Sequence, residues 1–157
     1  SKNVEKFFAI YPEGRFIALV RYPVQWFVAV SGHEPETYGD TEWTINRWKE
    51  SVRAVMKTRK KFDDRVCLIK FENLIDRTES VMRHLATFLG ISYQDILLEP
   101  TFNWIPIQPA NGQKTDNPVA KLPSFTESKP LDKDQRILIE KMTVADYQSA
   151  LQHVVAF

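Results

Sequence analysis

Several features that define common protein classes are scarce or missing in this sequence of 157 residues. There is a single cysteine, Cys67, so a disulfide framework is excluded and a reducing, cytoplasmic compartment is indicated. The 21 lysines and arginines nearly balance the 20 aspartates and glutamates, which argues against a nucleic-acid or membrane-surface protein. The longest apolar runs, 16–20 and 26–30, are far too short to span a bilayer. Any anion site must therefore be local.

Metal-ligand and phosphate-loop patterns are also missing from the sequence. His33, His84 and His153 are scattered and share no ligand spacing with Cys67, so no metal site is predicted and Cys67 is interpreted as a core residue. The five glycines are isolated, and none belongs to a glycine-rich turn that joins a strand to a helix. A kinase-like phosphotransferase would need such a turn, so the sequence disfavours that class.

What the sequence does contain is the pattern of one α/β domain over residues 1–157. Residues 15–21 and 65–71 are apolar runs bounded by charge, typical of strands buried on both faces of a parallel sheet. Helical periodicity predicts helices over 4–10, 23–31, 40–60, 78–89 and 132–151.

Four helix ends are marked by particular residues. Asp40 is expected to cap the long helix that follows it, and Asp132 with Gln135 to form a capping box at the start of the last helix. Gly32 and Gly90 are expected to stop the two helices that precede them.

Two strands do not make an independent sheet, so the predicted sheet is incomplete. The missing strands would come from a short strand within residues 99–130, from a missing N-terminal segment, or from another subunit such as a homodimer partner. Residues 99–130 form a long loop that holds six of the nine prolines, and a loop of that length inside a compact domain usually has a function.

The most informative position is the turn that follows the first predicted strand. Ligands of open parallel sheets bind beyond the carboxyl ends of the strands, which is where Arg21 falls. The helix that begins at Pro23 adds free N–H groups and the positive end of its dipole. An arginine beside a helix N-terminus suits a phosphate. Taken alone, this pattern is more often an arginine that ends a strand and pairs with an acidic neighbour.

A series of short motifs resembles the sulfotransferases that use 3′-phosphoadenosine 5′-phosphosulfate (PAPS). The first is Arg21-Tyr22-Pro23 with Ser31 downstream, similar to Arg-Asp-Pro…Ser. Residues 71–74 are similar to Tyr-Glu-Asp-Leu, and 88–91 to the Phe-Leu-Gly that ends the next helix. Residues 97–103, 106–107 and 110–111 are similar to a run in a bacterial subset. The resemblance covers about residues 8–150, and it implies the C-terminal portion of a P-loop-like sulfotransferase fold.

The resemblance also implies a function and a site. PAPS would be the donor, and a hydroxyl or amine of a small molecule or glycan would be the acceptor. Arg21 and Ser31 would bind the 3′-phosphate, Phe71 would flank the adenine, and Lys114 would reach the phosphate from a closing loop. Alternatively, Phe71 is a core aromatic residue and Lys114 belongs to a simple turn. Glu72 is expected to hold a helix N-terminus or a basic partner, and no catalytic base is assigned.

The sequence also departs from the family pattern. The family serine lies two residues before Ser31, at Ala29, and two residues turn an α-helix by about 200°. The N-terminal phosphosulfate-binding loop of the family has no match here, so the chain alone is expected to be a poor catalyst. These departures favour a rival interpretation, a non-catalytic interaction module that keeps the fold and uses its Pro-rich loop for protein contacts.

Overall fold

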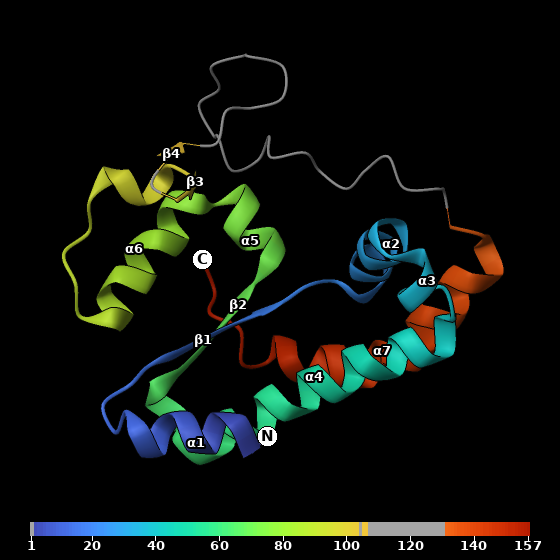
Figure 1. Ribbon diagram of the computed structural model, residues 1–157, viewed down its shortest axis with the longest axis horizontal. Helices are drawn as coiled ribbons and strands as arrows, with labels where there is room; N and C mark the ends of the chain where they lie inside the picture. Colours follow the sequence, from blue (N-terminus) through green and yellow to red (C-terminus); the bar gives the residue numbers. More distant parts are fainter. Residues whose placement is uncertain (1, 104, 107–130) are drawn as a thin grey trace.

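The computed structural model describes residues 2–103, 105–106 and 131–157 (Figure 1). In chain order the elements are α1 (Lys2–Ile10), β1 (Phe16–Val20), α2 (Pro23–His33), α3 (Pro35–Tyr38), α4 (Thr41–Phe62), η1 (Asp63–Arg65), β2 (Val66–Lys70), α5 (Phe71–Asp76), α6 (Thr78–Leu89), η2 (Asp95–Leu98), β3 (Thr101–Phe102), β4 (Ile105–Pro106) and α7 (Lys133–Leu151).

The two long strands pair in parallel, as the sequence predicted. Their register places Phe16 opposite Val66 and Val20 opposite Lys70. Both strands therefore end at the same edge of the sheet, and the residues that follow them, Arg21 and Phe71, are brought together. The pair forms a small sheet with helices around it, which fits an α/β class, whereas the fuller P-loop-like sulfotransferase architecture stays a prediction.

Helices pack on both faces of this sheet. Ala18, Val20 and Leu68 pack on one face with residues of α4 and α7, which lie side by side. On the other face, Cys67 and Ile69 contact α6 and the residues that follow α7. Figure 1 shows this division, with α5 and α6 on one side of the strands and α4 and α7 on the other. A third cluster joins α2 to α4 and α7 through Val24, Phe27, Ile45 and Ile139.

The expectation that both strands are buried on both faces is wrong for β1. Leu19 is 52% exposed, although its neighbours Ala18 and Val20 are only 7% and 4% exposed. On β2, the carbonyls of Leu68 and Val66 accept hydrogen bonds from Val155 N (3.2 Å) and an Arg59 guanidinium nitrogen (3.0 Å). The outer edge of β2 is thus covered, while no strand of the described residues pairs with the outer edge of β1.

Two of the predicted helix ends are confirmed. Asp40 caps α4, because one of its carboxylate oxygens accepts a hydrogen bond from Trp43 N at 2.7 Å. Gly90 ends α6 in the left-handed conformation, with a φ of 71° that glycine adopts without steric cost.

The other two predicted helix ends are wrong. Gly32 does not stop α2, which continues to His33 and gives way to α3 at Pro35, a residue that disfavours helix in the residue before it. The capping box at the start of α7 does not form, since the Asp132 side chain makes no capping hydrogen bond. Instead, Gln135 donates from Nε2 to Thr41 Oγ1 at 2.6 Å and ties the start of α7 to the start of α4.

Several short elements were not predicted. The helices α3 and α5 span only four and six residues, too few for a periodic apolar pattern to be visible in the sequence. The strands β3 and β4 pair with each other in antiparallel fashion, within the 99–130 segment that was one of three places considered for a missing strand. They do not join the sheet of β1 and β2.

Candidate functional site

Arg21 and Phe71 lie together at the shared carboxyl edge of β1 and β2. Each residue directly follows its strand, so the register Val20 opposite Lys70 sets them side by side. The guanidinium carbon of Arg21 lies over the Phe71 ring, 4.7 Å from the ring centroid, a cation–π geometry. The ring therefore supports one face of the arginine fork.

The Arg21 guanidinium is partly buried and is not consumed by an ion pair. Its Nε is buried and has no hydrogen-bond partner among the described residues. None of the ion pairs in that part of the chain involves Arg21. Burial lowers the pKa of Arg21 and the charge of Glu72 acts to raise it, but an arginine side chain stays charged in proteins. The result is a cation with a free donor.

The backbone beside Arg21 is anchored by two side chains. The Arg21 carbonyl accepts a hydrogen bond from Trp48 Nε1 at 3.3 Å, and Tyr22 N donates to Glu72 Oε1 at 2.9 Å. Because Tyr22 is the residue that precedes α2, this confirms the expectation that Glu72 holds a helix N-terminus. The second oxygen of the carboxylate, Glu72 Oε2, is buried without a partner in the described part of the chain.

Tyr22, which precedes α2, and Tyr147 of α7 form a cluster beside this backbone. The Tyr22 hydroxyl donates to Glu140 Oε1 at 2.8 Å, and the Tyr147 ring lies 5.6 Å from the Tyr22 ring and 6.2 Å from the Trp48 ring. Burial, followed by the charge of Glu72, raises the pKa of Tyr147 to about 12. The hydrogen bond from Tyr22, and then that from Arg136, lowers the pKa of Glu140.

Sequence reasoning missed the contribution of α7 to this region. A signal was present, because Glu140, Tyr147 and the buried residues Thr143 and Ala150 recur at helical spacing and share one face. Their partner Tyr22 lies 118 residues before Glu140 in the chain, and periodicity does not reveal which distant residue such a face meets.

The remaining predicted site residues lie elsewhere. Ser31 is in the last turns of α2, where its hydroxyl donates to the carbonyl of Phe27 at 2.7 Å. It follows Pro23 by eight residues, which places it about 12 Å further along the helix axis. Ala29, at the position of the family serine, is buried. Lys114 lies outside the described residues.

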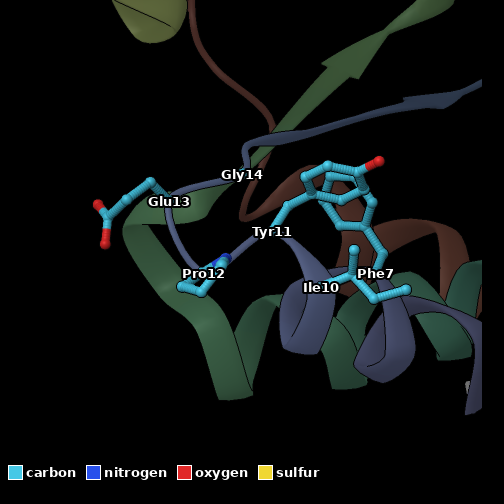
Figure 2. Close-up of a pocket in the computed structure, with 6 residues that line it drawn as sticks. All are labelled: Phe7, Ile10, Tyr11, Pro12, Glu13 and Gly14. Carbon is cyan, nitrogen blue, oxygen red and sulfur yellow. The ribbon is translucent and has the colours of Figure 1, made fainter.

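A hollow of about 460 Å³ lies at the opposite end of β1. It is lined by Phe7, Ile10, Tyr11, Pro12, Glu13 and Gly14. Figure 2 shows the Phe7 and Tyr11 rings side by side and the Glu13 carboxylate pointing away from them. This hollow has no cation to hold a phosphate, and the five residues of β1, about 16 Å of extended chain, separate it from Arg21. The surroundings of Arg21 and the hollow are therefore distinct.

A comparison with protein families identifies the class of the chain. A model described as the sulfotransferase family matches residues 1–95, which is more than half of the 157 residues. The chain belongs to the sulfotransferase family. The match includes Arg21, Ser31, Phe71 and Glu72, and it confirms the resemblance at the level of the family. No curated protein and no solved structure matches this chain.

Two further properties of the described residues concern membranes and metal ions. In residues 2–103, 105–106 and 131–157, no helix is both long and apolar enough to span a bilayer. Within the same ranges, no three histidine, cysteine, aspartate or glutamate residues are grouped closely enough to bind a metal ion.

Proposed function

We propose that this sulfotransferase binds PAPS and that Arg21 holds its 3′-phosphate. The observation that carries the proposal is the buried Nε of Arg21, which has no partner within the described residues and lies at the edge where both parallel strands end. Guanidinium groups bind phosphate through charge-assisted, often bidentate hydrogen bonds, so a charged fork without an ion pair suits this ligand. When bound, PAPS supplies the sulfuryl group that is transferred.

The other predicted site residues have smaller roles in this proposal. Phe71 flanks the adenine, and its ring also contacts the Arg21 guanidinium. Because phenylalanine has no hydroxyl, it contributes ring packing but no hydrogen bond to the base. Lys114, which lies outside the described residues, adds a contact to the phosphate in this proposal. Ser31 would have to exchange its hydrogen bond to the Phe27 carbonyl for one to the phosphate. The acceptor is a hydroxyl or amine of a small molecule or glycan, and the reaction takes place in the cytoplasm.

One observation favours a second candidate function, a non-catalytic interaction module. At the position of the family serine the chain has Ala29, which is buried, and the nearby Ser31 hydroxyl is already bonded to the backbone of its own helix. A module that had lost PAPS binding would keep the fold of the family without these hydroxyl contacts.

Calorimetry with adenosine 3′,5′-bisphosphate separates the two functions. This probe carries the 3′-phosphate and the adenine but no sulfuryl group, so it measures binding without turnover. Arg21→Ala is expected to weaken binding about 10- to 100-fold, the loss of a hydrogen bond to a charged group. Arg47→Ala is the matched control, because Arg47 is exposed on α4, where it forms an ion pair with Glu50 and lies over the Trp43 ring.

Each outcome of this experiment decides between the candidates. Binding by the wild type that Arg21→Ala weakens and Arg47→Ala preserves supports PAPS binding at Arg21. If the wild type and Arg21→Ala bind equally strongly, Arg21 is not part of the binding site. No binding by a folded wild-type protein supports the interaction module instead.

A further inference from the structure

The peptide group between Arg21 and Tyr22 is held at both of its polar ends. Its carbonyl oxygen accepts from Trp48 Nε1, and its N–H donates to Glu72 Oε1. The two partners come from α4 and α5, so a rotation of the peptide plane would break one bond or the other. The Cα of Arg21 lies between this plane and the end of β1, where Val20 pairs with Lys70. Because the backbone is held on both sides of the Cα, the direction in which the side chain leaves it is restricted.

Glu72 also acts on Arg21 through its charge, without bonding to it. Its charge raises the pKa of Arg21 against the effect of burial, yet the two side chains form no ion pair. Instead, the carboxylate makes its hydrogen bond to the Tyr22 N–H. The guanidinium donors thus stay available for a ligand, while a negative charge stays close to the place where an anion would bind.

We propose that Glu72 is a positioning residue for the anion site. Through the Tyr22 N–H it orients Arg21, and through its charge it limits the affinity for anions. This inference rests on the function proposed above for Arg21. The two effects have different origins, because the hydrogen bond needs only an acceptor oxygen, which glutamine also has, whereas the repulsion needs the charge.

Two substitutions of Glu72 separate these effects by calorimetry with adenosine 3′,5′-bisphosphate. Glu72→Gln keeps the acceptor and loses the charge, so binding is expected to become severalfold tighter than in the wild type. Glu72→Ala loses both, so binding is expected to be at least tenfold weaker than in Glu72→Gln. Glu50→Gln is the matched control for the charge change, since Glu50 is exposed on α4, and it is expected to leave the affinity unchanged.

Two results would overturn the positioning role. If Glu72 is only structural, both variants lower the melting temperature while the folded proteins bind with the affinity of the wild type. If its charge itself holds the site together, Glu72→Gln and Glu72→Ala weaken binding equally.

Hydrogen exchange distinguishes failure of this inference from failure of the proposed function. Exchange of the Tyr22 amide is expected to be slow in the wild type and in Glu72→Gln, and fast in Glu72→Ala. If the wild type binds no bisphosphate, the proposed function fails and the exchange rates still test whether Glu72 holds the peptide. Equal Tyr22 exchange in all three proteins overturns the inference, whatever the ligand does.

Discussion

Arg21 and Phe71, fifty residues apart in the sequence, form one unit in which the ring lies 4.7 Å beneath the guanidinium carbon. Both residues directly follow a strand of the parallel pair, so the unit is a consequence of strand register and needs no contact from a loop. Its two parts suit two parts of a nucleotide, the fork a phosphate and the ring a base.

Substitution of Phe71 tests the proposed contact with adenine. Phe71→Leu is expected to weaken adenosine 3′,5′-bisphosphate binding about 5- to 100-fold, because stacking of a base on an aromatic ring contributes about 1–3 kcal/mol. Binding of pyrophosphate, which has no base, is expected to weaken less, and both affinities are measured by calorimetry.

The control for this substitution is Phe88→Leu. The Phe88 ring also lies beneath an arginine, Arg15, at 5.3 Å, but at the end of α6. Phe88→Leu is expected to leave the affinities for adenosine 3′,5′-bisphosphate and for pyrophosphate unchanged. Equal weakening of the two ligands by Phe71→Leu would mean that the ring only supports Arg21 and does not contact the base.

Tyr147 makes the stability of the protein sensitive to alkaline pH. Its pKa in the folded protein is about 12, above the value of about 10 for an unperturbed tyrosine. Between these values the unfolded state releases the phenolic proton first, so the free energy of unfolding falls as the pH rises through this window. Burial raises the pKa values of Tyr22 and Tyr93 as well, which acts in the same direction.

Urea unfolding at pH 9 and pH 11 measures this effect. The wild type is expected to lose more stability between the two conditions than Tyr147→Phe, which has no proton to release. Tyr11→Phe, on an exposed side chain, is expected to follow the wild type. If the wild type and Tyr147→Phe lose the same free energy of unfolding between pH 9 and pH 11, the raised pKa of Tyr147 is not the cause.

The outer edge of β1 is expected to promote self-association. Leu19 is 52% exposed on a strand whose outer edge is paired with no other strand of the described residues, and such edges are templates for pairing with other chains. Leu19→Lys is expected to reduce the self-association measured by sedimentation and to change the free energy of unfolding by less than about 0.5 kcal/mol.

Leu151→Lys adds the same charge at an exposed position on α7 and serves as the control. If both substitutions reduce association equally, net charge explains the effect and the strand edge does not.

Those parts of the fold that depend on local pattern were predicted well. The strands, the parallel pairing and the position of Arg21 follow from two apolar runs separated by helical sequence. Features that depend on distant neighbours were not predicted. The exposure of Leu19 depends on what lies beside β1. Gln135 bonds to Thr41 at the start of α4 and does not form the capping box of its own helix, α7. Gly32 failed as a stop signal because a glycine ends a helix in the left-handed conformation, which Gly32 does not adopt.

The same division holds for the candidate site. The location of Arg21 was predicted because it follows a strand and the ends of parallel strands converge, whereas Phe71 was predicted from the family resemblance. Their roles in binding stay predictions. Trp48 was assigned no part of the site, although its indole N–H bonds to the Arg21 carbonyl. A buried tryptophan on an apolar helix face looks the same in the sequence whether its nitrogen has a functional partner or not.

The bond from Trp48 to Arg21 also equips the molecule with an internal optical reporter. Indole emission responds to the hydrogen bonding and electric field around its nitrogen, and this nitrogen touches the main chain of the proposed anion-binding arginine. Occupancy of the site should thus be visible as a change in the protein's own fluorescence, without any attached dye.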